Sequence, residues 1–354
     1  MIALNNAIRS GGIARVIVLI AAGGPGSFVS LRAMRLPRPC FQLFCPSDMA
    51  MPHLILVTGK GGTGKSSTAG ALALALSKRG KTVLADLDQR RTAARLLGVE
   101  LELEGDGHFP AIANLEVRSF TPRTELETFI ERIVPIKVIS RRMLRSHTFG
   151  YVTAALPGLE AFLMLERLRQ LADEAAAWNG FAVIDAPASG SVLELLSVSQ
   201  GVRDLAPSGT LNRLARTVDE FLRDPHRFGV LLTARPERLA IREALETLAT
   251  LRAERGIGYI AVILNGVPDP LLSPSDYAKI RRLAMHRRLA LQRKATCERA
   301  VRAHKQFEEA GVEVIELPML YTSKFARPQL EMLAGAIESS WTAREERGVK
   351  PQSR

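Results

Sequence analysis

Cysteine is scarce in this chain, with three residues among 354. Cys40 and Cys45 lie in a distinct N-terminal segment, and only Cys297 lies in the body of the chain. Three cysteines are too few for a disulfide framework, and a single one cannot build a multi-cysteine metal site. We therefore expect a protein of the reducing cytoplasm.

Long apolar runs are also missing. No run reaches the roughly 18–20 residues that a membrane-spanning helix requires. The best candidate, IARVIVLIAAGG near the N-terminus, is shorter and contains Arg15. We expect no stable membrane insertion.

Acidic residues are rare in two segments, and these segments account for the whole net charge of +12. Residues 1–50 carry +4, from five arginines and one acid, and residues 276–305 carry +8, from ten lysines and arginines and two acids. The remainder of the chain is neutral. Any case for a nucleic-acid partner must rest on those two segments, and we do not expect such a partner.

Residues 1–50 do not resemble the rest of the chain. They are rich in arginine, poor in acids and interrupted by GGPG and LPRPC. A targeting peptide is one interpretation; we favour a disordered or mis-assigned extension, with the working protein beginning at Met49 or Met51, because a strand follows at once. Residues 51–340 then form a single domain, and residues 341–354 form a polar tail.

Apolar strands alternate with helical stretches along residues 51–340. The expected strands are Leu54–Thr58, Lys81–Asp88, Asn114–Phe120, Gly180–Ala186, Phe228–Ala234, Gly258–Asn265 and Gly311–Leu317. Nearly continuous apolar strands predict an α/β fold with a mainly parallel sheet covered by helices on both faces. Helical insertions are expected at about 124–171 and 192–222 and would form a small subdomain. We find no internal repeat.

The segment GKGGTGKSS, which begins at Gly59, matches the phosphate-loop pattern G-x-x-x-x-G-K-[ST]. It follows a predicted strand and opens a predicted helix, the context in which this pattern is specific for a P-loop NTPase. Glycines let backbone N–H groups surround phosphate oxygens, and the helix start adds positive partial charge. We expect Lys65 to reach the β- and γ-phosphates of ATP and Ser66 to ligate Mg²⁺.

A second lysine, Lys60, follows the first glycine of this loop, where ordinary phosphate loops need none. It could be solvated, contact its own nucleotide, or cross a dimer interface to the nucleotide of a partner. Spacing alone leaves these three alternatives open.

Acidic residues end two of the predicted strands, and ligands of a parallel sheet lie beyond the carboxyl ends of its strands. Asp185 follows an apolar run and is expected to hold Mg²⁺ through water. One of Asp86 and Asp88 should position the attacking water; we favour Asp88, which lies further toward the nucleotide. The small residues after Asp185, APASGS, predict a loop that rearranges when the γ-phosphate leaves. Asn265 could pair with the adenine edge or serve as a turn residue.

Four segments together carry a family resemblance. The phosphate loop with its extra lysine resembles the deviant Walker A of the ATPase class that includes ParA, MinD, nitrogenase iron protein and ArsA. DAPASGSVLELL (Asp185–Leu196), LPGLEAFLMLERL (Leu156–Leu168) and VIELPML (Val314–Leu320) resemble segments of the ArsA-like anion-transporting ATPases. The likeness covers roughly residues 52–340.

The resemblance implies a homodimer, or a pair with a paralogous ATPase subunit, with ATP at the interface. Lys60 would stabilise charge at the partner's nucleotide, as an arginine finger does. Asp88 would position water, Pro318 would lie beside the base, and dimer closure would be coupled to an unidentified protein client, for which a hydrophobic protein is one option. The implied nucleotide-binding residues are Gly59, Gly61, Gly62, Thr63, Gly64, Lys65, Ser66, Ser67, Asn265 and Pro318; Lys60, Lys65 and Asp88 would be catalytic, and Ser66 and Asp185 would serve the metal.

The sequence departs from this family at several points. Asp88 is followed by Gln89-Arg90-Arg91 instead of P-A-H, and Ser191 replaces the family histidine after the Walker B strand, which affects expectations for hydrolysis more than for binding. Cys297 alone cannot bind arsenite, so we reject metalloid activation. The chain has no C-x-x-C motif for the zinc site of the tail-anchored-protein targeting ATPase, and its helical blocks hold few methionines.

Two alternatives come from other functional classes. A ParA- or MinD-like positioning ATPase would bind DNA or a membrane surface in its ATP state, and the basic segment Lys279–Lys305 could serve this role. The ordinary interpretation of that segment is a helix with one apolar face on the core and one solvated basic face. A regulatory nucleotide-binding protein with little or no turnover is the other alternative.

Overall fold

The computed structural model describes residues 51–87, 91–99, 107–120, 125, 158–269 and 284–348. All of them belong to one unit of the chain, residues 43–354. Asp88 and the segment 126–157, on which part of the predicted helical insertion falls, lie outside the described residues.

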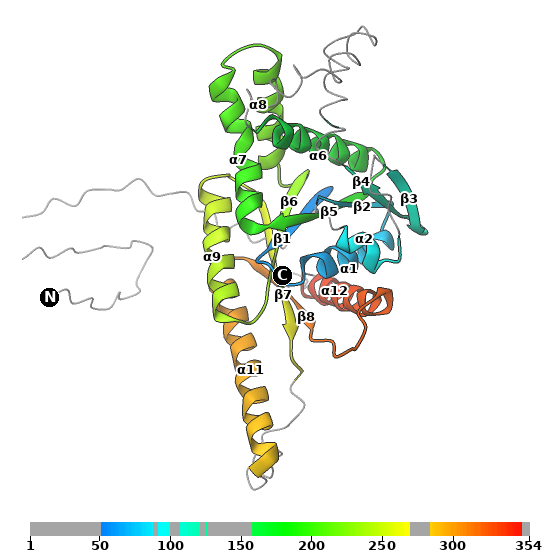
Figure 1. Cartoon of the computed structure of the whole chain (residues 1–354), viewed down its shortest axis with the longest axis vertical. Helices are drawn as coiled ribbons and strands as arrows, with labels where there is room; N and C mark the ends of the chain where they lie inside the picture. The colour runs from blue at the N-terminus through cyan, green and yellow to red at the C-terminus, as the bar shows by residue number, and fades with distance from the viewer. Residues whose placement is uncertain are drawn as a thin grey trace, which may run out of the picture. The chain divides into compact units, whose positions relative to one another are not determined.

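A mainly parallel sheet forms the centre of the described part of the chain (Figure 1). Its eight strands lie in the order β3-β4-β2-β5-β1-β6-β7-β8, and all pairs are parallel except β3 with β4 at one edge. The strands are β1 (Leu54–Gly59), β2 (Thr82–Asp86), β3 (Gly107–Ile112), β4 (Leu115–Ser119), β5 (Phe181–Ala188), β6 (Phe228–Ala234), β7 (Tyr259–Val267) and β8 (Glu313–Pro318). The predicted α/β fold is confirmed.

The strands are apolar on both faces because each face carries its own core. On β1, Leu54 and Leu56 contribute to one cluster, whereas Ile55 contributes to the other. All four apolar side chains from Leu54 to Val57 are at most 1% exposed. A strand that is buried in this way needs apolar residues at every position, which explains why the sequence reads as continuous apolar runs.

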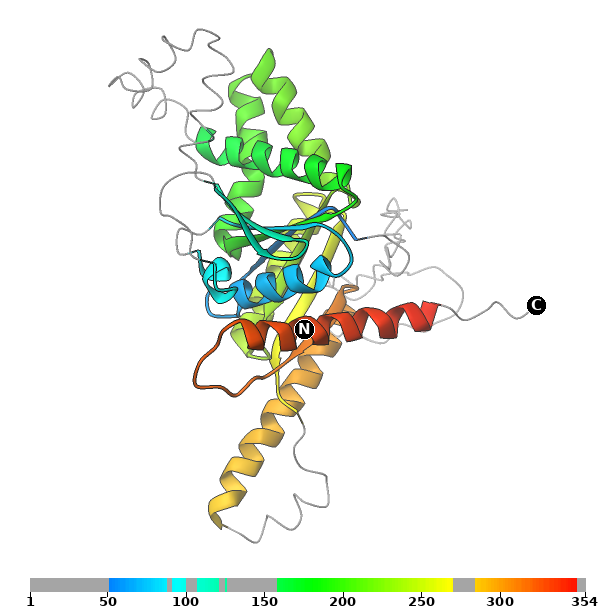
Figure 2. The ribbon, with the colours of Figure 1, turned by 90° about the vertical axis from the view of Figure 1, so that its right-hand side faces the viewer.

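Helices cover both faces of the sheet. One face is covered by α1 (Lys65–Ser77), α2 (Thr92–Leu96) and α12 (Arg327–Gly348), and α1 and α12 lie side by side there (Figures 1 and 2). The opposite face is covered by α6 (Leu159–Ala177), α7 (Ser189–Leu205), α8 (Thr210–Arg223), α9 (Arg238–Ala253) and α11 (Ala284–Glu309).

Three of these helices, α6, α7 and α8, contact one another beyond the end of the sheet (Figure 1). A separate small helical subdomain stays a prediction, since all three helices also contribute to the core on this face of the sheet. The second predicted insertion, 192–222, consists of two helices, because the chain turns between Ala206 and Gly209. Phe221 of α8 is fully buried and packs edge-on against Phe228 of β6, which ties α8 to the sheet.

Two elements differ from what the sequence suggests. Strand β3 was not predicted, since GHFPAI has no apolar run and contains Pro110; such a strand is tolerated at an edge. The predicted polar tail begins inside α12, where Trp341 is 5% exposed and the Arg79 guanidinium lies 4.5 Å from its ring centroid. Within the described ranges, no helix is both long and apolar enough to cross a membrane.

Candidate functional site

The phosphate loop connects β1 to α1, and two of its glycines are required by close contacts. Gly59 has a φ of 152°, and a Cβ there would lie 2.1 Å from the carbonyl oxygen of Thr233. Gly64 has a φ of 92°, and a Cβ there would lie 2.2 Å from Nδ2 of Asn265. Any other residue would be strained at either position, because both φ values lie in the region that L side chains avoid, and its Cβ would collide with the Thr233 backbone or the Asn265 side chain.

The rest of the loop presents an open start of helix α1. No side chain caps this helix, and Gly64 occupies the cap position. Gly61 and Gly62 are exposed, while Lys65, Ser66 and Ser67 are partly exposed on the first turn. The Thr63 hydroxyl donates a hydrogen bond of 2.8 Å to the Lys60 carbonyl oxygen and fixes the loop. Uncapped N–H groups beside an ammonium group suit a polyphosphate, so the loop fits ATP.

Asn265 braces the phosphate loop from strand β7. Its side-chain amide donates a hydrogen bond of 2.8 Å to the carbonyl oxygen of Thr63. Pro318 ends the neighbouring strand β8, where it pairs with Val267. The structure therefore places Asn265 against the loop and Pro318 nearby on the adjoining strand end; a role of either residue at the nucleotide base stays a prediction.

Two of the three predicted carboxylates are direct neighbours. Asp86 on β2 and Asp185 on β5 pair in register, and they are 3% and 1% exposed. Asp86 also accepts a hydrogen bond of 3.2 Å from the N–H of Ala93, which anchors the start of α2. Asp185 on β5 pairs with Val57 on β1, the strand that leads into the phosphate loop. This arrangement brings both carboxylates to the end of the sheet that carries the loop.

The segment after Asp185 is tied to the phosphate-loop strand. The Thr58 hydroxyl donates a hydrogen bond of 2.8 Å to the carbonyl oxygen of Pro187. Ser189 then begins α7, and Ser191 on its first turn is exposed. A rearrangement of this segment would therefore be transmitted to β1 on one side and to α7 on the other.

The Lys60 side chain forms an ion pair with a residue that the sequence analysis did not identify as part of the site. Its ammonium group lies 2.8 Å from a carboxylate oxygen of Glu243 on α9, and the Ser189 hydroxyl donates a hydrogen bond of 3.1 Å to the other oxygen. The hydrogen bond from Lys60 lowers the pKa of Glu243 below its ordinary value, against a smaller opposing effect of burial. The Lys60 side chain keeps 42% exposure, so it is held at the surface and is not part of the core.

No sequence signal singles out Glu243. It lies in a helix of mixed charges, where an acid ordinarily faces solvent. Its importance follows only from the fold, which sets α9 beside the phosphate loop.

Metal binding by protein side chains alone has no support in the described residues, where no three His, Cys, Asp or Glu side chains cluster. Ser66 and Asp185 are suited to an ion that is mainly held by phosphates and water.

The chain is similar to known nucleotide-binding proteins. The family model for the CobQ/CobB/MinD/ParA nucleotide binding domain matches residues 54–288. ATPase BagA of Mycobacterium tuberculosis is 30% identical over 250 residues, which are 66% of this chain and 71% of that protein. The arsenical pump-driving ATPase of Escherichia coli is 28% identical over 204 residues, which are 56% of this chain and 32% of that protein. The chain thus spans about a third of the pump ATPase.

Proposed function

This chain belongs to the CobQ/CobB/MinD/ParA nucleotide-binding family and is an ATPase, and from that premise we propose that it hydrolyses ATP as a homodimer of the ArsA type. Closure of the dimer around ATP would be coupled to binding or release of a protein client in the cytoplasm. The observation that carries the proposal is the surface position of Lys60, whose ammonium group pairs with the partly exposed carboxylate of Glu243.

Each part of the phosphate loop has a role in this proposal. Loop N–H groups and Lys65 hold the phosphates and keep the terminal phosphate in place for in-line attack. Ser66, and Asp185 through water, would hold Mg²⁺, which when bound neutralises charge on the phosphates. The hydrogen bond from Thr58 to Pro187 supports a coupling between β1, which leads into the loop, and the segment that we propose responds to the γ-phosphate.

Asp88 is proposed to orient the attacking water. Asp86, the other candidate, is buried and already accepts a hydrogen bond from the Ala93 backbone, which supports a structural role for it. A water-positioning group needs an oxygen that is available to water, since orientation matters more than basicity in phosphoanhydride hydrolysis.

Lys60 is proposed to leave Glu243 and stabilise charge at the partner's nucleotide. An ion pair with this exposure is worth about 0–1 kcal/mol in water. The developing charge of a phosphoryl-transfer transition state in a closed, dry interface attracts an ammonium group more strongly. The exchange of one anionic partner for another is therefore favourable once the dimer has closed.

A ParA- or MinD-like positioning ATPase is the second candidate, and the family match is equally compatible with it. The observation in its favour is α11, which carries seven lysines and arginines against three glutamates. ATP-dependent retention on nonspecific DNA that disappears as salt rises would support that candidate over ours.

Sedimentation velocity with and without ATP and Mg²⁺ tests the proposal. We expect a monomer without nucleotide and a dimer with ATP, in a variant, Asp88→Asn, that binds ATP and hydrolyses it slowly. The matched control is Lys65→Ala, which should fail to bind ATP and stay monomeric. A monomer under all conditions, in protein that demonstrably binds ATP, would remove the proposed mechanism. Co-purification with the ATP-trapped variant would then identify the client.

A further inference from the structure

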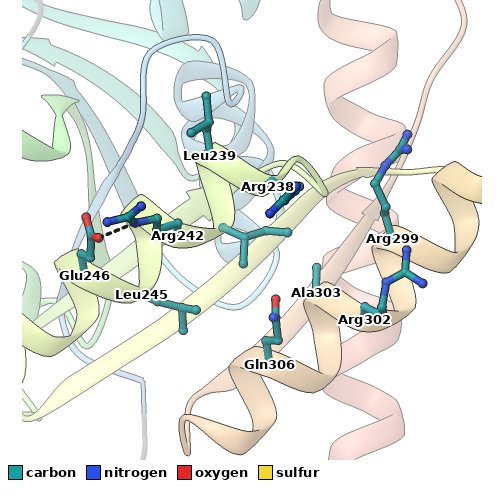
Figure 3. A pocket seen from close by; sticks show the side chains of 10 residues that line it. Arg238, Leu239, Arg242, Leu245, Glu246, Arg299, Arg302, Ala303 and Gln306 are labelled. Carbon is teal, nitrogen blue, oxygen red and sulfur yellow. Dashed lines mark hydrogen bonds and ion pairs between the residues drawn. The ribbon is translucent and has the colours of Figure 1, made fainter.

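Helices α9 and α11 border a groove of about 850 Å³ on the same face of the sheet. Arginines line it from both helices: Arg238 and Arg242 from α9, and Arg299 and Arg302 from α11 (Figure 3). The groove contains no phosphate-loop residue, although α9 also carries Glu243, the partner of Lys60.

The positive charge of the groove is mostly uncompensated. Glu246 is the only acid lining it, and it is already paired with Arg242 at 2.8 Å. Arg299 donates a hydrogen bond of 2.8 Å to the Thr296 hydroxyl, which is neutral. Across the described residues, no carboxylate pairs with Arg238 or Arg302. Three of the four arginines that line the groove, Arg238, Arg299 and Arg302, thus have no carboxylate partner among the described residues, which favours a ligand with several carboxylates or phosphates.

The same groove also has apolar walls. Leu239 is 71% exposed at its edge, Leu245 is partly buried, and Ala303 is fully buried at its base. A ligand that offered only phosphates to the arginines would leave these apolar side chains in water. Arginines above an apolar floor instead fit an amphipathic ligand, whose apolar side chains enter the groove while its carboxylates meet the guanidinium groups.

The length of the groove and the charge of the chain's N-terminal segment limit which ligand can occupy the groove. Along α9 the groove runs from Arg238 to Glu246, a distance of roughly 12 Å at the rise of an α-helix. That length matches about two turns of a docked helix. The chain's own N-terminal segment carries +4, so it has the wrong charge to fill the groove. A flat bilayer also does not reach into a recess between two helices.

We propose that the groove between α9 and α11 binds an acidic amphipathic helix of another protein. The docked helix inserts apolar side chains beside Leu239 and Leu245 and presents carboxylates to Arg238, Arg299 and Arg302. Binding does not require ATP, so it can be measured separately from the proposed dimer mechanism.

A synthetic peptide tests the proposal by fluorescence anisotropy. The probe is a labelled helix of about 18 residues, with leucines on one face and glutamates beside them. We expect saturable binding without nucleotide, and a loss of at least about tenfold in Arg238→Glu/Arg302→Glu. The matched control, Arg213→Glu/Arg288→Glu, makes the same charge change on exposed arginines elsewhere and should bind normally. Leu239→Ser should weaken binding several-fold, whereas Leu289→Ser, at another exposed leucine, should not.

Several results would overturn the proposal. One is no saturable binding to the wild-type protein. Another is equal weakening by the control pair, which would mean unspecific attraction between charges. A peptide with serines in place of its leucines that binds as tightly would show that the apolar floor is not used. Retention on phosphatidylglycerol vesicles that is lost in Arg238→Glu/Arg302→Glu, without peptide binding, would assign the groove to a membrane surface. ATP turnover of these variants, measured in parallel, should stay at the wild-type rate.

Discussion

The Lys60 ammonium group lies 2.8 Å from the carboxylate of Glu243, and Ser189 donates a hydrogen bond to the same carboxylate. The three residues come from the phosphate loop, from α9 and from the start of α7. Through Glu243, the loop that binds phosphate contacts the segment that follows the Walker B strand. In the proposed mechanism, this contact holds Lys60 within its own subunit until the partner's nucleotide offers a stronger anion.

Removing the carboxylate should make dimerisation easier. In Glu243→Gln, Lys60 no longer has an anionic partner to leave. The association constant for ATP-dependent dimerisation should therefore rise by about 1.5- to 5-fold, the factor that corresponds to the free energy of an exposed ion pair. Sedimentation equilibrium with ATP measures it. Glu246→Gln is the control, because it changes an exposed, paired acid one turn away. An association constant that is unchanged in Glu243→Gln, or that rises equally in both variants, contradicts the role of Glu243.

Titration of Glu243 should report on the same contact. Because its folded-state pKa is lowered, the ion pair stabilises the protein above the ordinary glutamate pKa of about 4.3, and this contribution is lost as the pH falls through the lowered value. In Lys60→Ala the pKa should rise toward its ordinary value, as measured by NMR of the side-chain carboxyl carbon. In Glu174, burial raises the pKa but the hydrogen bonds from Arg118 and Arg167 outweigh it, and this lowered pKa should not change. Equal shifts in both residues would indicate a general disturbance of the fold.

The close contact at the first loop glycine predicts a sharp difference between two alanine variants. Gly59→Ala places a Cβ against the Thr233 carbonyl oxygen at an unfavourable φ, which should cost more than about 2 kcal/mol and abolish nucleotide binding. Gly61→Ala meets no atom within 4 Å and should fold normally. Thermal unfolding and binding of a fluorescent ATP analogue measure both effects. Normal nucleotide binding by Gly59→Ala would show that the loop can move away from β6.

Much of the fold could be predicted because its strands are buried on both faces. Continuous apolar runs such as FGVLLTA mark such strands directly, and β6 spans the predicted residues, Phe228–Ala234. Strand β3 escaped prediction because an edge strand with a proline has no such run. Contacts between surface residues were even harder to predict from the sequence. Nothing in the sequence links Lys60 to Glu243, since an acid on an amphipathic helix looks like any solvated residue until the fold brings it to the loop.

Asn265 shows an intermediate case. Its place near the end of an apolar strand indicates the edge of the sheet that carries the phosphate loop, and the structure places it against that loop. Its hydrogen bond to the Thr63 carbonyl oxygen depends on the alignment of β7 with the loop, which no local pattern encodes. Sequence therefore located the residue but could not choose between a ligand of the base and a brace for the loop.

The roles of Asp86 and Asp88 can be separated by two asparagine variants. Asp88→Asn should keep ATP affinity and lose most of the hydrolysis rate, because water is no longer oriented. Asp86→Asn should mainly lower the Tm, since Asp86 is buried and anchors α2 through the Ala93 N–H. Single-turnover hydrolysis and thermal unfolding distinguish the two. Retained hydrolysis in Asp88→Asn, with loss in Asp86→Asn, would move the water-positioning role to Asp86.

The central claim is that Lys60 acts at the partner's nucleotide, and mixing two inactive variants tests it most directly. Lys60→Ala keeps its own phosphate loop, and Lys65→Ala keeps the lysine that crosses. Each protein alone should be inactive, whereas an equimolar mixture should recover part of the wild-type ATPase rate, because each mixed dimer has one complete site, formed by the phosphate loop of Lys60→Ala and the Lys60 of Lys65→Ala. A mixture that stays as inactive as its components, or full activity of Lys60→Ala alone, would contradict the claim.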